Sequence, residues 1–90
     1  MPNLYFEGNE LMALKKSLAE LKENESGVIV SVAGGFGLQR RLATLGIRTG
    51  KKIRMLTAQP FQGPIVVEVD RAHVAIGRGM ARKVLVEVSR

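Results

Sequence analysis

The side chains that could carry out chemistry are few in this sequence. His73 is the single histidine of the 90 residues, and the chain contains no cysteine. A serine or threonine nucleophile needs a positioned base and a metal site needs several ligands at fixed spacings, so one isolated imidazole supports neither strongly. We therefore predict that the protein is not an enzyme and requires no cofactor. With Glu68 or Asp70 nearby, His73 is at most a weak candidate ligand for a transition metal ion such as Fe²⁺, Zn²⁺ or Mn²⁺.

A glycine-rich loop, Gly34-Gly35-Phe36-Gly37, raises the question of phosphate binding. A Walker loop ends in Gly-Lys-Ser or Gly-Lys-Thr, and a dinucleotide loop needs G-x-G-x-x-G within a βαβ unit. Neither pattern is present, and the chain leaves no room for a parallel crossover connection. The loop is therefore interpreted as a flexible entry into the helix that follows it.

Basic residues dominate the chain beyond residue 25. The net charge is +6, but residues 1–25 carry −2 and residues 26–90 carry +8, and no acid occurs between Ser26 and Val67. A basic surface of this kind favours an acidic protein partner, nucleic acid or anionic lipid, although a solvated basic face without a partner is the simpler alternative. The cations expected to contact a partner are Arg40, Arg41, Arg48, Lys51, Lys52 and Arg54.

Aromatic residues make up 4% of the chain, and Tyr5, Phe36 and Phe61 are widely separated. Such sparse aromatics do not form the stacking platform that binds single-stranded nucleic acid, so a small basic barrel that binds nucleic acid is kept only as an alternative. Phe61 lies in a turn-rich segment, 59–64, and we expect it at the tip of a hairpin. There it would serve as the apolar anchor of a protein interface.

Length and composition indicate one small globular domain. Hydrophobic residues form 46% of the chain, which is enough for a core. The lack of cysteine, of a membrane-spanning apolar run and of a signal-peptide pattern leads us to expect a cytoplasmic protein. Residues 1–9 contain Asn-Leu-Tyr-Phe-Glu-Gly, which resembles a tobacco-etch-type protease site with Glu in place of Gln. They are interpreted as an expression remnant or a disordered terminus, and residues 10–90 as the single domain.

The element that organises the rest is a short helix expected at about 37–45. Leu38, Leu42 and Leu45 fall at spacings of four and three, so they share one helical face. Gly46 follows, where a helix end favours a left-handed residue, and we therefore predict a positive φ at this glycine. We expect Leu42 and Leu45 to be buried in the core. The residues predicted to surround them are Ile53, Val66 and Val86.

Short β-branched segments bounded by turn residues accompany this helix. The strands are predicted at 28–32, 51–57, 65–70, 73–76 and 84–88. An irregular or extended segment through Leu14 is expected to precede them, with one helical turn over 18–21 and a 3₁₀ turn near 78–81. Five to six short antiparallel strands predict a mainly β, small SH3-like barrel, because closure removes exposed strand edges.

Four segments of the chain form a recognisable combination. They are Leu18-x-Glu20-Leu21-Lys22-x-x-x-x-Gly27, Arg41-Leu42-x-x-Leu45-Gly46-Ile47-x-x-Gly50, Pro60-Phe61-Gln62-Gly63-Pro64-Ile65 and Ala75-Ile76-Gly77-Arg78-Gly79-Met80-Ala81-x-x-Val84-x-Val86. The combination covers about residues 14–88 and resembles the FeoA family. The sequence departs from that family in having Asn24 where Gly or Pro is frequent, which changes the first turn slightly.

The resemblance implies a small SH3-like accessory protein of bacterial ferrous iron transport. It implies an interaction module that acts on FeoB, a membrane permease with a cytoplasmic GTPase domain, which could recruit the chain to the inner face of the membrane. A similar domain closes the metal-dependent regulators of the diphtheria-toxin-repressor type, so a metal-sensing role is a further alternative. No DNA-binding helices precede the domain here, and the stand-alone form is expected. A homo-oligomer is left open.

Overall fold

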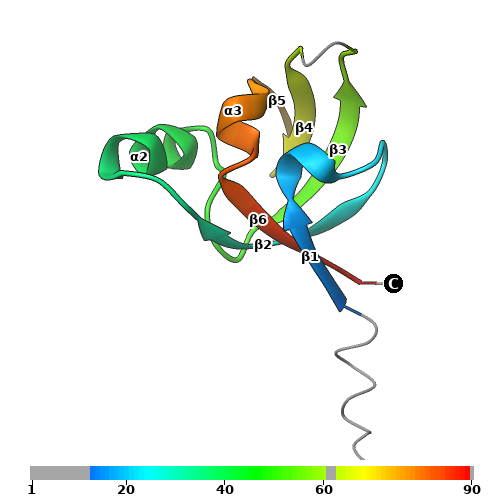
Figure 1. Cartoon of the computed structure of the whole chain (residues 1–90), viewed down its shortest axis with the longest axis horizontal. Helices are drawn as coiled ribbons and strands as arrows, with labels where there is room; N and C mark the ends of the chain where they lie inside the picture. The colour runs from blue at the N-terminus through cyan, green and yellow to red at the C-terminus, as the bar shows by residue number, and fades with distance from the viewer. Residues whose placement is uncertain (1–12, 61–62, 90) are drawn as a thin grey trace, which may run out of the picture.

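The computed structural model describes residues 13–60 and 63–89. Within them, six strands and three short helical segments follow one another along the chain (Figure 1). The strands are β1 (Ala13–Ser17), β2 (Ser26–Val32), β3 (Lys52–Ala58), β4 (Ile65–Val69), β5 (Ala72–Ile76) and β6 (Val84–Ser89). The helical segments are the 3₁₀ helix η1 (Leu18–Glu20) and the α-helices α2 (Phe36–Thr44) and α3 (Arg78–Ala81). The predicted mainly β class is confirmed.

The strands form one antiparallel sheet in the order β1-β6-β2-β3-β4-β5. Strands β1 and β5 are its two edges. The helix η1 follows β1 and contacts α3, which follows β5, so two short helical segments bring the ends of the sheet together. This closure gives the small SH3-like barrel that the sequence predicted, and α2 lies to one side of it (Figure 1).

The core is apolar and draws on nearly every element. Leu42, Ile53 and Val86 are completely buried, as predicted. Val66 is only half-buried, so its predicted place in the core is wrong, and Val67 is buried instead. Successive side chains of a strand point to opposite faces of the sheet. Because Glu68 points outward, Val67 points into the core and Val66 points away from it. The other buried residues are Leu18, Leu21, Ile29, Ile47, Met55, Ile65, Val69, Ile76, Ala81, Val84 and Val88.

Helix α2 ends in a hydrogen-bonded glycine cap. Gly46 has a φ of 90°, which confirms the predicted positive φ. The N–H of Ile47 donates to the carbonyl of Leu42 at 2.9 Å, and the N–H of Gly46 donates to that of Ala43 at 2.9 Å, which is the Schellman pattern. Ile47 thereby enters the core with 1% exposure. Leu45 remains 37% exposed, so the prediction that it is buried is wrong. The chain reverses at the cap, and Ile47 occupies the core in place of Leu45.

The first turns of the chain follow local side-chain chemistry. The N–H of Ser17 donates to Oε1 of Glu20 at 3.1 Å, which is one half of a capping box at the start of η1. The residues before it, expected to be irregular or extended, form β1 and pair with β6. Asn24 has a φ of 69°, in the left-handed region that asparagine tolerates better than most residues. An asparagine can therefore replace the frequent Gly at this turn.

The other helical segments are short. The turn predicted as 3₁₀ at 78–81 is the α-helix α3, because Ala81 and Arg82 donate to the carbonyls four residues earlier, Gly77 and Arg78, at 3.0 and 2.9 Å. It carries Ala81 into the core, while Met80 is half-buried. No helix in residues 13–60 and 63–89 combines the length and the apolar character needed to cross a membrane.

Candidate partner-binding surface

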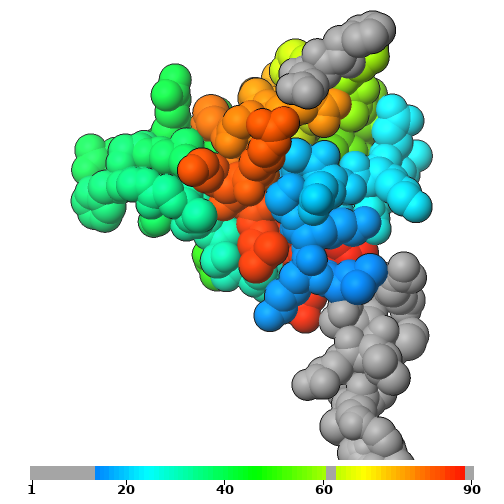
Figure 2. Space-filling model, in the orientation of Figure 1, coloured from blue at the N-terminus to red at the C-terminus, as the bar shows by residue number. Residues whose placement is uncertain are grey.

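The structure divides the predicted basic residues between two regions. Arg40 and Arg41 lie on α2, and Arg48 follows its cap. Lys52 and Arg54 lie at the start of β3, and Lys51 directly precedes that strand. Helix α2 extends away from the barrel and from β3 and β4, as both overall views show (Figures 1 and 2). The predicted residues therefore do not form one continuous cluster.

The α2 surface pairs an aromatic ring with a cation. Phe36 is 79% exposed, and the guanidinium carbon of Arg40 lies 5.7 Å from the centroid of its ring, which is within the range of a cation–π contact. Both side chains point away from Leu42, because residues four apart share a helical face. Arg41 is exposed as well. We define Phe36, Arg40 and Arg41 as the α2 surface.

Polar contacts hold α2 in position. The amide of Gln39 donates to the carbonyl oxygens of Val32 at 3.2 Å and Gly34 at 3.1 Å, which ties the helix to the end of β2. At the other end, Nε of Arg48 donates to the carbonyl of Ala43 at 3.3 Å. A cation at the C-terminus of a helix is favourable because the last carbonyls lack partners and carry partial negative charge. Arg48 thus has a structural contact that its exposed charge alone did not indicate.

Acidic residues from β4 and the turn after it neutralise two of the β3 cations. Nε and Nη2 of Arg54 donate to Oε1 of Glu68 at 3.2 and 2.8 Å. The hydrogen bond from Arg54 lowers the pKa of the Glu68 carboxyl, and the charges of Arg54 and His73 act in the same direction. Nζ of Lys51 lies 2.9 Å from Oδ2 of Asp70. Two predicted partner contacts are therefore ion pairs within the chain.

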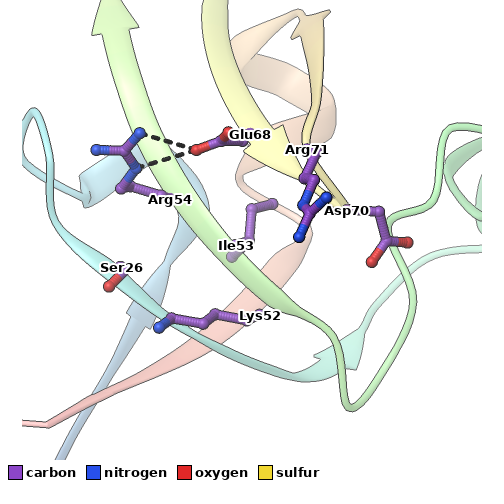
Figure 3. A pocket seen from close by; sticks show the side chains of 7 residues that line it. All are labelled: Ser26, Lys52, Ile53, Arg54, Glu68, Asp70 and Arg71. Atoms are coloured by element: carbon purple, nitrogen blue, oxygen red, sulfur yellow. Dashed lines mark hydrogen bonds and ion pairs between the residues drawn. The ribbon is translucent and has the colours of Figure 1, made fainter.

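A shallow pocket of about 340 Å³ opens between β3 and the β4–β5 turn (Figure 3). Its lining residues are Ser26, Lys52, Ile53, Arg54, Glu68, Asp70 and Arg71. We call it the β3–β4 pocket. Sequence reasoning missed Arg71 as a surface residue of interest, although it is the basic member of the short turn between two strands.

A second hollow of about 370 Å³ lies between β2 and α2. It is lined by Val30, Ser31, Val32, Gln39, Ala43, Ile47, Arg48 and Thr49. Its walls mix polar and apolar groups, and it lies beside the structural contacts of Gln39 and Arg48. The base of α2 is therefore open to contact as well as its exposed face.

The structure supports a functional role less clearly for two other predicted site residues, Phe61 and His73. Phe61, the expected apolar anchor, lies outside the described residues. His73 is exposed on β5 and faces Glu68 in the antiparallel register. Within the part of the chain that the structure describes, no group of three or more His, Cys, Asp or Glu side chains could hold a metal ion. Metal binding at His73 stays a prediction.

These features define a class of protein: a small antiparallel β-barrel that offers charged surfaces for binding. A family model, "FeoA domain", matches residues 16–88. The "Putative Fe(2+) transport protein A" of Methanocaldococcus jannaschii is 36% identical over 70 residues, which are 78% of this chain and 83% of that protein. The chain belongs to the FeoA family, and it is a non-catalytic accessory protein of Fe²⁺ transport.

Solved structures share the fold. The crystal structure of an iron uptake regulatory protein (FeoA) matches with a TM-score of 0.77 and 32% identity, over 81% of this chain and 96% of that one. A manganese-dependent transcriptional repressor matches with a TM-score of 0.76 and 26% identity, over 84% of this chain and 42% of the repressor. The predicted likeness to a domain of metal-dependent regulators is therefore confirmed.

Proposed function

We propose that this chain acts in ferrous iron transport by binding the cytoplasmic GTPase portion of an FeoB-type permease, and that the α2 surface makes the principal contact. The observation that carries the proposal is the 79% exposed Phe36 beside Arg40, on a helix that extends from the barrel (Figure 2). A large aromatic ring that is mostly exposed to water and lies beside a cation is well suited to an interface. Aromatic residues and arginine are enriched among the residues that dominate binding energy.

The charges of the α2 surface favour an acidic partner. Helix α2 contains no Asp or Glu, and Arg40 and Arg41 form no salt bridge within residues 13–60 and 63–89. Such unpaired surface cations mainly raise the rate of association with a negatively charged surface and make that rate depend on salt. The exposed ring of Phe36 would then slow dissociation, because burial of its apolar area stabilises the complex.

The test measures binding of a purified FeoB-type GTPase domain by surface-based kinetics. Phe36→Ala should raise the dissociation rate by about tenfold or more, as the loss of an aromatic anchor worth ~1.4 kcal/mol does. The matched control is Arg82→Glu with Lys83→Glu, which alters exposed cations between α3 and β6 and should leave dissociation unchanged. Equal dissociation rates for the wild type and Phe36→Ala would contradict an interface at α2. Phe61→Ala belongs in the same series, because Phe61 was predicted as an anchor.

A further inference from the structure

The turn between β4 and β5 holds an arginine in an unfavourable backbone conformation. Val69 pairs with Ala72, so the turn has only two central residues, Asp70 and Arg71. Their φ angles are 52° and 68°, both in the left-handed region, as in a type I′ hairpin turn. Asp tolerates this region, but the second position strongly favours glycine, because a side chain there crowds the backbone. An arginine at such a position suggests a use for its side chain, since strained residues cluster at functional sites.

The side chain of Arg71 contributes to the β3–β4 pocket. Figure 3 shows its guanidinium extending from the turn toward the side of β3 that carries Ile53, between the side chains of Glu68 and Asp70. In the same view Lys52 and the hydroxyl of Ser26, which comes from β2, lie on the other side of β3 from Arg71. Side chains from three strands and a turn therefore line one hollow, and Arg71 is the cation on the side of the β4–β5 turn.

The two carboxylates of the pocket are already engaged. Arg54 binds Glu68 at 2.8 Å, and Lys51 binds Asp70 at 2.9 Å. Lys52 and Arg71 have no salt bridge among the residues described. The lining includes three cations and two carboxylates, which leaves a net charge of +1. A singly charged oxyanion would balance this charge, whereas a phosphate dianion would face two carboxylates in the wall.

A smaller hollow continues the pocket along β2. Its volume is about 260 Å³, and it shares Ser26 and Lys52 with the β3–β4 pocket. Val28, which is 43% exposed, and Glu87 complete its lining with Gly27. An apolar side chain could cover Val28, whereas Glu87 would repel a second acid. The two hollows together therefore suit a peptide that has one carboxylate next to an apolar residue.

We propose that the β3–β4 pocket binds a single carboxylate of an extended acidic peptide segment, with Arg71 as its ligand and Lys52 as a second, flexible cation of the pocket lining. The planar guanidinium of Arg71 offers paired N–H donors that match a carboxylate. The inference deepens the proposed function, because such a segment would belong to the same partner. Its test uses a peptide alone, so failure here leaves binding of the GTPase domain to be judged separately.

The probe is the peptide acetyl-Val-Glu-Val-amide, added to the ¹⁵N-labelled full chain at low salt and followed by NMR chemical shifts. The shifts should concentrate at Ser26, Lys52 and Arg71, and acetyl-Val-Gln-Val-amide should bind at least about fivefold more weakly, since it lacks the charge. Inorganic phosphate forms a third arm. Tighter binding of phosphate than of the Glu peptide, or equal binding of both peptides, would overturn the assignment.

Variants separate a binding role from a structural one. Arg71→Gly should weaken the Glu peptide at least about fivefold while moving the unfolding midpoint to higher denaturant, because glycine relieves the left-handed strain. Lys52→Gln should weaken the peptide without that gain in stability. Arg82→Gln, outside the pocket, is the charge-matched control and should not alter peptide binding. Unaltered peptide affinity in both Arg71→Gly and Lys52→Gln would refute the proposal.

Discussion

Helix α2 and strand β3 both carry basic side chains, but the surroundings of those side chains differ. On α2, Arg40 stacks on Phe36 and has no acid beside it in the described structure. Arg54 on β3 and Lys51 just before it are paired with Glu68 and Asp70, respectively. Charge that is paired inside the protein has little left to attract a partner, whereas unpaired charge steers association. Whether a basic segment can attract a partner therefore depends less on its number of cations than on whether a neighbouring strand carries acids that pair with them.

The two regions also differ in how they are attached to the molecule. Strand β3 lies inside the sheet, between β2 and β4. Helix α2 has no backbone ladder to the sheet. It is held by the buried Leu42, by Leu38 packed against the core, by its Schellman cap and by the side-chain hydrogen bonds of Gln39 and Arg48. A binding surface on α2 is therefore expected to be sensitive to changes in those few contacts.

The largest expected effect tests the anchoring of α2 by Leu42. Leu42→Ala should lower the free energy of unfolding by about 2–5 kcal/mol, because it leaves a cavity at a fully buried site. Leu45→Ala, on the same helix but 37% exposed, should cost less than about 1 kcal/mol. Denaturant unfolding followed by circular dichroism measures both. Similar costs for the two leucines would mean that Leu42 does not anchor the helix.

A smaller effect is expected at the cap. Gly46→Ala should destabilise the protein by about 1 kcal/mol or more, because alanine is unfavourable at a φ of 90°. Gly37→Ala is the control within the same helix, where a Cβ would meet nothing within 4 Å. It should stabilise the protein by about 0.5–1 kcal/mol, since alanine is the better helix former. If Gly46→Ala and Gly37→Ala changed the stability in the same direction, the role of Gly46 as the helix cap would be contradicted.

The smallest effect concerns the ion pair between Arg54 and Glu68. The pKa of Glu68 is lowered in the folded protein by its hydrogen bond from Arg54, so the pair stabilises the fold above the unfolded-state pKa of that carboxyl. That stabilisation is lost as the pH falls through the lowered folded-state pKa. Arg54→Gln should raise the pKa of Glu68, as measured by NMR titration, and its stability deficit should shrink in acid. An unchanged pKa would show that the pair does not form in solution.

Most of the fold was predictable because local signals agree with it. The β-branched runs formed strands, and Gly46 adopted the positive φ that its position after Leu45 indicated. The errors came from choosing between neighbouring apolar residues. Val66 and Val67 are both β-branched, and only the outward Glu68 shows which of them faces the core. Ile47 displaced Leu45 because the chain reverses at the cap.

The candidate site was less predictable because it depends on strand register. Arg54 is opposite Glu68, 14 residues later, and an irregularity between Met55 and Thr57 shifts the pairing just beyond. Spacing within either segment cannot reveal that contact. The role of Arg71 depends on a two-residue turn, which becomes visible only when the ends of β4 and β5 are known. The exposed ring of Phe36 was treated as part of a loop, whereas the helix begins there.

The most direct test compares the two basic regions in one experiment. Association with the FeoB-type GTPase domain is measured from low to moderate salt for Arg40→Gln/Arg41→Gln and for Lys51→Gln/Arg54→Gln, which lower the net charge equally. The α2 variant should associate several-fold more slowly at low salt and depend less on salt, because unpaired charges steer the encounter. The β3 variant, whose cations lie away from α2, should slow association less than the α2 variant does. A slower, salt-insensitive β3 variant beside an unaltered α2 variant would contradict the account.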